Sequence, residues 1–294
     1  MSKDKWLIVG ANGALGSDLI EAFGEAAIPA TRLDFDMTHK EDMYQFIINQ
    51  PITGVINTAA FHNVPLCEKE PQNAFEVNAL GVKNLAELCA YLNIHLCHIS
   101  TDYVFDGSKQ KPYLETDLPR PLNTYAISKL AGEQMVQAYC PSHTIIRSCG
   151  LYGRVPTRAK GDNFITKIVK QAKSGASLKV VNDEWVTPTC THDLAFAIKA
   201  LLANWRHEEV HGLFHVNQAG ETTWFDVAKV VLDSMGFQNT LEAVSKADFP
   251  STLNRPTYSI LSCDRFKHVS GHQIDDWETA LRNFLKRHGE ELKD

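Results

Sequence analysis

The sequence predicts an α/β protein with a Rossmann-like, doubly wound parallel sheet and a smaller C-terminal region. Two observations lead to this fold class. Short apolar runs alternate with helical patterns through the first half of the 294 residues, and a glycine-rich turn directly follows the first run. Continuous apolar strands that alternate with amphipathic helices are typical of a parallel sheet covered on both faces.

The first element is a strand at residues 6–10, WLIVG, which leads directly into the turn GANGALG at 10–16. An amphipathic stretch follows and predicts a helix. A GxxGxxG spacing alone is a weak signal, but strand, turn and helix in this succession form the context of a dinucleotide-binding site. There the glycines permit close approach to a pyrophosphate, which the helix N-terminus receives.

The second strand, expected at residues 28–33, ends at the position that selects the cofactor. NAD sites usually place an acidic residue there to bind the ribose diol, whereas an arginine accommodates a 2′-phosphate. If the register is kept, the acidic position falls on Thr31 and Arg32 follows it, which favours NADP(H). If Asp34 binds the ribose instead, the cofactor is NAD(H).

The remaining elements follow from the same periodicities. Strands are expected at 54–57, 96–100 and 143–148, and helices at about 39–48, 71–92 and 122–135. The second half is expected to mix short strands with helices, namely strands at 178–181 and 213–217 and helices at 163–174, 191–204, 222–235 and 275–288. Residues 154–163 are polar and basic, which suits a segment that closes over a ligand.

Composition narrows the class of protein. The net charge of −6 and the pI near 6.1 argue against a nucleic-acid partner. The N-terminal apolar run is too short for a signal peptide or a membrane span, so we expect no membrane partner and a cytoplasmic location. Seven scattered cysteines without a CxxC pair indicate reduced thiols, and the twelve histidines show no metal-ligand spacing.

Tyr125 and Lys129 are the candidate catalytic pair. They lie four residues apart in LNTYAISKLAGEQM, so a helix places both side chains on one face. An ammonium beside a phenol lowers the pKa of that phenol, which can then exchange a proton with a carbonyl or alcohol oxygen. The same pair is also common on exposed helices. Ser100 and Thr101 end the strand at 96–100, where open α/β sheets bind ligands.

With these residues in place, the chain resembles the extended short-chain dehydrogenase/reductase superfamily, and within it the dTDP-4-dehydrorhamnose reductase family. The resemblance covers nearly the whole chain. It is most specific where STDYVFDG joins YxxxKLAGE, whereas the glycine turn is shared with many relatives. The motifs that carry it are GANGALG (10–16), NTAA (57–60), EPQNAFEVNALGVKNLAELC (70–89), STDYVFDG (100–107), RPLNTYAISKLAGE (120–133), NDEWVTPT (182–189), GLFHVNQAGETTWFDVA (212–228) and RPTYS (255–259).

This resemblance implies an NADPH-dependent oxidoreductase that reduces the C4 keto group of a nucleotide-linked sugar, as in dTDP-rhamnose biosynthesis. Tyr125 would protonate the sugar oxygen and Thr101 would hydrogen-bond it. Lys129 would bind the nicotinamide ribose and lower the pKa of Tyr125. The NADP-binding Rossmann domain would occupy residues 1–153, with contributions from 182–216, and the substrate-binding region mainly 154–294.

The resemblance also assigns two sets of binding residues. The set expected to bind the cofactor comprises Gly10, Asn12, Gly13, Ala14, Leu15, Gly16, Arg32, Asp36, Met37, Ala59, Ala60, Asn78, Tyr125 and Lys129. The set expected to face the nucleotide sugar comprises Val64, Thr101, Asp102, Gly150, Thr187, Pro188, Thr189 and Arg255.

Three departures from the family pattern concern sugar recognition. Pro65 and Leu66 stand where the family usually has an Asp and often a Lys. Gly150 stands where several members have Trp, and the segment DQxGxPT here carries Glu184 and Val186 in place of Gln and Gly. The identity of the sugar therefore stays open.

Two other functions stay open at this stage. The chain also resembles the regulatory β subunit of methionine adenosyltransferase, a non-catalytic NADP-binding partner of another enzyme. A reductase or epimerase of a different nucleotide sugar is the other alternative. The resemblance further implies a homodimer, and some family members use a divalent ion such as Mg²⁺ between subunits.

Overall fold

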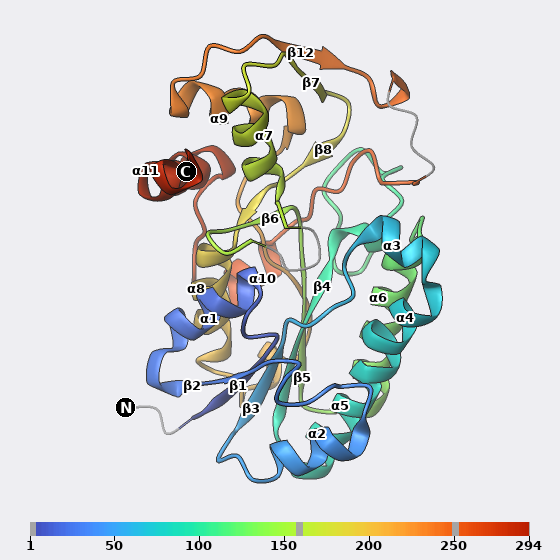
Figure 1. Cartoon of the computed structure of the whole chain (residues 1–294). Helices are drawn as coiled ribbons and strands as arrows, with labels where there is room; N and C mark the ends of the chain where they lie inside the picture. The colour runs from blue at the N-terminus through green and yellow to red at the C-terminus, as the bar shows by residue number, and fades with distance from the viewer. Residues whose placement is uncertain (1–3, 157–160, 249–252, 294) are drawn as a thin grey trace.

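The computed structural model describes residues 4–156, 161–248 and 253–293, and it contains a six-stranded parallel sheet (Figure 1). The strand order is β10-β5-β4-β3-β1-β2. The direction in which the chain adds strands to the sheet reverses between β1 and β3, while the strands themselves stay parallel. This is the doubly wound arrangement that the sequence predicts, and ligands bind such sheets at the reversal point. The strands are β1 Trp6–Val9, β2 Ala27–Ala30, β3 Gly54–Asn57, β4 His95–Thr101, β5 His143–Ser148 and β10 Gly212–His215.

Helices cover both faces of this sheet (Figure 1). On one face lie α1 (Ala14–Phe23), α8 (Thr191–Leu202) and α10 (Asp264–Ser270), and on the other α2 (Lys40–Ile47), α5 (Val82–Leu92) and α6 (Thr124–Tyr139). Strand β1 shows why both faces need cover. Trp6 and Ile8 pack into the core beneath α1 and α8, whereas Leu7 and Val9 pack into the core beneath α5 and α6.

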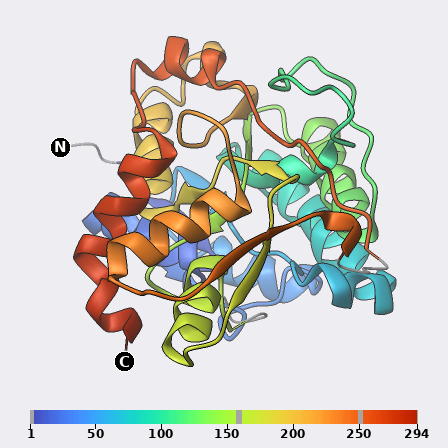
Figure 2. The ribbon, with the colours of Figure 1, turned by 90° about the horizontal axis from the view of Figure 1, so that it is seen from above.

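A smaller part lies beyond the carboxyl ends of the sheet strands (Figure 1). It contains α7 (Phe164–Lys173), α9 (Trp224–Met235) and α11 (Trp277–Lys293), and Figure 2 shows α9 beside α11. Ile168, Val231 and Leu281 belong to its shared core, which explains why three amphipathic helices assemble there. Its short strands pair as β7 (Leu178–Val181) with β12 (Leu241–Val244), β8 (Trp185–Val186) with β11 (Thr222–Thr223), and β6 (Leu151–Tyr152) with β9 (Thr189–Cys190).

Two predicted elements differ in the structure. Strand β2 ends at Ala30 rather than at residue 33, because the carboxylate of Asp34 accepts hydrogen bonds from the backbone N–H and hydroxyl of Thr31 and closes a turn. The helix predicted at 71–92 is divided into α4 (Pro71–Phe75), a π-helical turn (Glu76–Gly81) and α5. A single extra residue in a helix turn of this kind often marks a functional position.

Two helices were not expected from periodicity. α3 (Val64–Lys69) begins at Asn63, whose side chain caps it by accepting a bond from Leu66 N–H, and α10 is only seven residues long. Both are too short to show a clear apolar repeat. The core position of Phe266 also places α10 with the sheet, although its sequence lies within the predicted C-terminal region.

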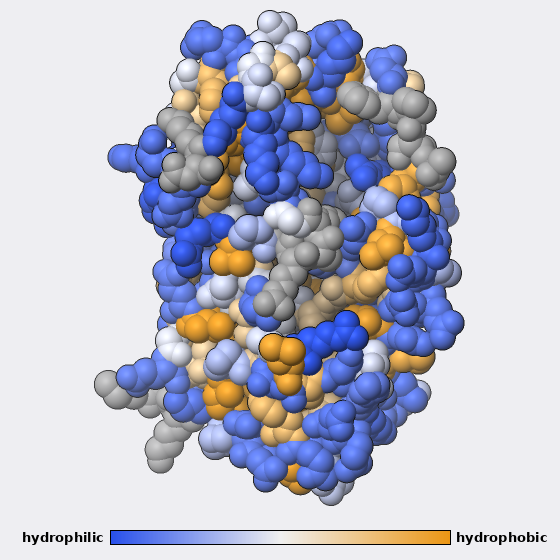
Figure 3. Space-filling view, viewed as in Figure 1, coloured by the Kyte–Doolittle hydropathy of each residue, from blue (hydrophilic) through white to orange (hydrophobic). Residues whose placement is uncertain are grey.

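The surface seen in Figure 3 is mostly hydrophilic and is interrupted by smaller apolar patches. Within the described residues, no helix is both long and apolar enough to cross a membrane. All seven cysteines are buried thiols, as predicted for core fillers. Of the segment 154–163, which the sequence suggests as a cover for a ligand, residues 157–160 lie outside the described residues.

Candidate active site

The end of β4 brings the predicted catalytic residues together. Thr101 is the last residue of this fully buried strand, and a 3-10 turn, Asp102–Val104, follows. The Thr101 hydroxyl accepts a bond from Tyr103 N–H (3.2 Å) and donates one to the Asp102 carboxylate (3.2 Å). It also lies close enough to the phenol of Tyr125 to lower the pKa of that phenol. The structure therefore places a hydroxyl and a phenol side by side at the ligand-binding edge of the sheet.

Helix α6 presents Tyr125 because its N-terminus is fixed from two directions. The side chain of Asn123 caps the helix by accepting a bond from Ala126 N–H (2.9 Å). Glu68 of α3 accepts bonds from the backbone N–H of Thr124 (2.6 Å) and from its hydroxyl (2.9 Å). Both contacts satisfy groups that a helix start leaves open, so Tyr125 projects from a rigid first turn.

The body of α6 lies unusually close to the π-helical turn. A Cβ on Gly132 would stand 2.2 Å from the backbone oxygen of Asn78, so only glycine permits this approach. The Asn78 amide donates to Ser128 Oγ (2.9 Å) and to Phe61 O (3.0 Å), while its oxygen accepts from Phe61 N–H (2.8 Å). Asn78 is fully buried, so it anchors the loop after β3 to α6 instead of lining the cofactor channel as predicted.

Lys129 lies one helical turn after Tyr125 and is almost completely buried. Its ammonium donates to Ile99 O (2.7 Å) and lies 3.4 Å from the ring Nε2 of His98. Burial lowers the pKa of Lys129 to about 8, and the negative charge of Glu133 opposes that shift. The pKa of His98 is lowered well below its ordinary value, by burial first and by the charge of Lys129 second. Lys129 therefore titrates near physiological pH beside a neutral imidazole.

The pKa of Tyr125 shifts in the opposite direction to the prediction. Burial raises it above its ordinary value, and the nearby Thr101 side chain only partly opposes the rise. Lys129 does not lower it in this geometry, because its ammonium is bonded to the backbone of β4. Tyr125 is consequently a phenol at neutral pH, which is the protonation state that a proton donor requires.

A buried ion pair underlies the catalytic residues. Arg147 of β5 donates from Nε and Nη2 to the two carboxylate oxygens of Glu133 on α6, at 2.9 and 2.6 Å. Ser100 Oγ donates to the same carboxylate. Both charged side chains are at most 3% exposed. A bidentate pair of this kind joins α6 to β4 and β5 in one geometry, so it fixes the helix that carries Tyr125 and Lys129.

The glycine turn after β1 is shaped to receive a group against its backbone. Gly10 has a φ of +82°, and a Cβ there would stand 2.7 Å from Thr58 Oγ1. A Cβ on Gly16 would stand 2.2 Å from Gly10 O. Gly13 is the N-cap of α1, whose first turn holds no acidic residue. The predicted Asn12, Ala14 and Leu15 belong to this turn and to the start of α1, where N–H groups attract anions.

In the turn after β2, one arginine is exposed, and the two acidic side chains are engaged in hydrogen bonds. Arg32 is 83% exposed and pairs with Asp36 at 2.8 Å. Although burial acts to raise the pKa of Asp36, bonds from Thr38 and the charge of Arg32 lower it below its ordinary value. Asp34 accepts bonds from Thr31. Met37 is buried in the core beneath α5, so its predicted contact with adenine is limited to its exposed edge.

The loop after β3 runs past the glycine turn. Asn57 Oδ1 accepts a bond from Ala59 N–H (3.1 Å), and Thr58 Oγ1 donates to Val9 O (2.8 Å). These bonds hold the half-buried Ala59 and Ala60 at the reversal point of the sheet. Both alanines therefore lie where the sequence predicts a cofactor channel, although the side chain that holds them is Asn57.

On the side expected to face the sugar, Asp102 and Arg255 lie within electrostatic reach of Tyr103. Burial raises the pKa of Tyr103, and the charge of Arg255 opposes that rise, which places the exposed guanidinium near the phenol. The ring of Tyr103 packs edge-on against Tyr125 with centroids 6.1 Å apart. Burial raises the pKa of the Asp102 carboxyl, which Ser259, Cys149 and Thr101 oppose by hydrogen bonding. Tyr103 therefore connects the catalytic residues with Arg255.

Two predicted sugar-facing residues have other roles. Thr187 and Thr189 are fully buried. The Thr187 hydroxyl donates to Gly220 O (2.8 Å), and the Thr189 hydroxyl donates to Thr187 O (3.1 Å). Their hydroxyls are thus bonded to the backbone and hold β9 and the loop before it, so the structure does not support them as direct contacts to a sugar.

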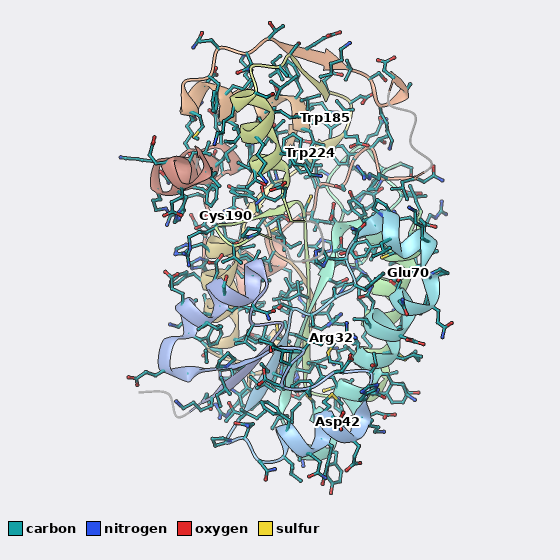
Figure 4. All side chains as sticks on the ribbon, in the orientation of Figure 1. Arg32, Asp42, Glu70, Trp185, Cys190 and Trp224 are labelled. Atoms are coloured by element: carbon teal, nitrogen blue, oxygen red, sulfur yellow. The ribbon has the colours of Figure 1, made fainter. Side chains whose placement is uncertain are left out.

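Gly150 is required by its backbone as well as by space. Its φ is +55°, and a Cβ there would stand 3.2 Å from Pro188 Cα and 3.4 Å from the ring of Trp224. Figure 4 shows Trp224 and Trp185 in the smaller part and Arg32 beside the sheet. Pro188 and Trp224 therefore lie directly against the backbone at Gly150. The remaining predicted residue, Val64, is buried at the start of α3.

Several residues of the site carried no signal that sequence reasoning used. Tyr103 lies inside STDYVFDG, so the motif itself could have indicated it. Lys246 carried no such signal. It forms an ion pair of 3.2 Å with Glu184, 62 residues away, which the sequence shows only as a departure from the family's Gln. As for a metal, the described residues contain no group of three or more His, Cys, Asp or Glu that could hold an ion.

Comparison with known proteins agrees with this geometry. A family model described as the RmlD substrate binding domain matches residues 4–289. A dTDP-4-keto-6-deoxy-D-glucose reductase of Streptomyces niveus is 36% identical over 283 residues, 95% of each chain. A dTDP-4-dehydrorhamnose reductase of Escherichia coli is 31% identical, over 95% of this chain and 96% of the relative.

A solved structure shows the same likeness. The crystal structure of dTDP-4-dehydrorhamnose reductase from Bacillus anthracis in complex with NADP has a TM-score of 0.91 and 30% identity. The similarity covers 97% of this chain and all of that one. Because the family model spans nearly the whole chain and these relatives exceed 30% identity along it, the protein belongs to the RmlD substrate-binding-domain family of extended short-chain dehydrogenases/reductases.

Proposed function

We propose that this protein uses NADPH to reduce the C4 keto group of a dTDP-linked 4-keto-6-deoxyhexose. The observation that carries the proposal is that Thr101, at the carboxyl end of β4, lies beside the phenol of Tyr125, with Lys129 one helical turn further along α6. Hydroxyl, phenol and ammonium are the groups that a carbonyl reduction needs, and the named relatives act on dTDP sugars.

Each catalytic residue has a separate task. The phenol of Tyr125 donates its proton to the oxygen at C4 as that oxygen gains negative charge, and Thr101 orients the oxygen through its hydroxyl. Lys129 in its ammonium form would bind the nicotinamide ribose of the cofactor, since its bond to Ile99 O leaves the pKa of Tyr125 unaffected. NADPH supplies the hydride when it is bound. The Glu133–Arg147 pair keeps α6 in register with β4, so these groups stay aligned.

The residues around the sheet reversal fit a dinucleotide. The glycine turn has no room for side chains at Gly10 and Gly16, and α1 begins directly after it. The preference for NADPH rests on Arg32, which is exposed in the turn after β2, while Asp34 is bonded to Thr31. The Bacillus anthracis relative was crystallised with NADP. Arg32 would bind the 2′-phosphate, since a guanidinium fits phosphate oxygens.

The nucleotide-sugar side is proposed to consist of Asp102, Tyr103, Gly150 and Arg255. Asp102 and Tyr103 would face the hexose, because they lie next to Thr101 and Tyr125. Arg255 would bind the diphosphate. Two relatives act on different dTDP sugars, so the stereochemistry of the hexose is the part of this proposal that needs a direct assay.

The test is loss of NADPH absorbance with two substrates, dTDP-4-keto-6-deoxy-L-mannose and dTDP-4-keto-6-deoxy-D-glucose. Turnover of either substrate, with NADH a poorer donor, is the expected result. If NADPH binds and neither sugar is reduced at high enzyme concentration, the proposal is wrong. A non-catalytic NADP-binding regulator would then be favoured. Elution as a homodimer in size-exclusion chromatography is a separate expectation.

A further inference from the structure

The backbone on either side of Arg255 is anchored to two distant parts of the chain. Asn254 O accepts a bond of 2.9 Å from the side chain of Asn123, the residue that caps the catalytic helix α6. Arg255 O accepts a bond of 2.6 Å from the ammonium of Lys246. The exposed guanidinium therefore projects from a main chain that is fixed at two successive carbonyls.

Lys246 is itself held by two acidic neighbours before β8. Its ammonium lies 3.2 Å from a carboxylate oxygen of Glu184, which is only 10% exposed. The carboxylate of Asp183 accepts bonds from Lys246 N–H (2.9 Å) and from Ser245 Oγ (2.7 Å). Because backbone and side chain are both held, Lys246 loses little further freedom when it bonds to Arg255 O.

The segment after Arg255 is joined to the same strand. Trp185 N–H donates to Thr257 O (2.7 Å), and Ser259 N–H donates to Trp185 O (3.1 Å). Ser259 in turn lies close enough to Asp102, the neighbour of Thr101, to lower the pKa of its carboxyl. The position of Arg255 is thus coupled to β8 on one side and to the catalytic turn on the other.

We propose that Lys246 and Glu184 are a positioning pair that fixes Arg255 to bind the diphosphate of the nucleotide sugar. The inference rests on the proposed function, since Arg255 is assigned to the diphosphate there. Glu184 neutralises Lys246, so the guanidinium is the cation presented to the ligand, with a planar fork that suits two phosphate oxygens. Glu184 stands where the family pattern has Gln, so this chain forms an ion pair that a neutral Gln could not form.

The experiment measures dTDP binding by calorimetry and the kinetics of sugar reduction in six variants. Lys246→Met removes the ammonium, and Arg255→Ala removes the proposed ligand contact. The double variant tests whether one acts through the other. Lys179→Met is the matched control, because Lys179 pairs with Glu242 at 3.4 Å between β7 and β12, far in sequence from Arg255.

Lys246→Met is expected to weaken dTDP binding about tenfold and to raise KM similarly, with kcat and NADPH affinity within about twofold. In the Arg255→Ala background it should add nothing, because the residue on which it acts is gone. Glu184→Gln should have a smaller effect in the same direction, and Lys246→Arg should restore part of the affinity. Lys179→Met should leave every value unchanged.

Three results would overturn the inference. The first is Lys246→Met behaving like Lys179→Met. The second is an undiminished loss in the Arg255→Ala background, which would mean that Lys246 contacts the diphosphate itself. The third is an equal loss of dTDP affinity in Lys246→Met and Lys246→Arg, accompanied by an equal fall in the urea midpoint of unfolding. That result would mean that both variants act by destabilising the fold. If the wild type binds dTDP but reduces no sugar, the proposed function fails, and the dTDP measurements still decide this inference.

Discussion

The catalytic side and the sugar side of the candidate site are built differently. Thr101, Tyr125 and Lys129 come from two regular elements, β4 and α6, and the ion pair of Glu133 and Arg147 joins these elements inside the core. Arg255 lies in a loop that is held at two backbone carbonyls. One accepts from the side chain of Asn123, which is 131 residues from Asn254, and the other from that of Lys246, which is nine residues from Arg255. The candidate catalytic residues are thus held by secondary structure. The residues proposed to bind the nucleotide sugar are held by loops, which tolerate sequence change.

Tyr125→Phe is the variant that should separate these two sides most clearly. It removes the proton donor and leaves the ring, so turnover should fall about 10²–10⁴-fold while dTDP and NADPH affinities stay nearly unchanged. Steady-state kinetics and calorimetry measure the two effects. Tyr103→Phe is the matched control, since it alters the neighbouring ring on the sugar side and should change KM more than kcat. Normal turnover by Tyr125→Phe would remove Tyr125 from the mechanism.

Glu133→Gln tests the support beneath the catalytic side. It leaves the guanidinium of Arg147 buried without its countercharge, which should lower the free energy of unfolding by about 3–5 kcal/mol in urea titration. Glu278→Gln is the control, because its pair with Arg282 on α11 is about half exposed and should contribute no more than about 1 kcal/mol. Equal losses in the two variants would show that the buried pair does not hold α6 in place.

Much of the catalytic side could be predicted from the sequence because its signals are local. The glycine turn lies directly after β1, and Tyr125 and Lys129 are one helical turn apart. Thr101 is the last residue of β4, a strand that is buried along its whole length. Local spacing fixes these side chains on one face or at one edge, so the fold and the positions of the candidate catalytic residues follow from periodicity together with the family motifs.

The sugar side could not be predicted in the same way. Thr187 and Thr189 match the family motif, yet their hydroxyls bond to backbone in the fully buried start of β9. Nothing near Lys246 in the sequence indicates a partner at Glu184 or at Arg255 O. Such contacts depend on how loops pack in three dimensions. The direction of the Tyr125 pKa shift was wrong for the same reason, because burial outweighed a charge that the sequence places nearby.

The pH dependence of the reaction should report the catalytic side alone. Burial lowers the pKa of Lys129 to about 8, so its ammonium is present below pH 8 and is lost as the pH rises through that value. Since the ammonium is proposed to bind the nicotinamide ribose, rates at limiting NADPH should fall about tenfold per pH unit above 8. The pKa of Tyr125 is raised, so it adds no change there. A rate that stays constant up to pH 10 would contradict this role for Lys129.

Arg32→Ala should produce the smallest effect, because it concerns one exposed contact at the edge of the cofactor site. NADPH binding should weaken about tenfold and NADH binding should not change, since only NADPH carries a 2′-phosphate. Arg282→Ala is the matched control, because both arginines form exposed pairs with an acidic residue four positions away on the chain. Equal weakening of both cofactors by Arg32→Ala would mean that loss of the pair with Asp36 distorts the turn after β2, and that Arg32 does not read the phosphate. An effect confined to NADPH would instead mean that one exposed side chain in the turn after β2 determines cofactor specificity. This turn would then differ from the catalytic side and the sugar side, which both depend on buried supports.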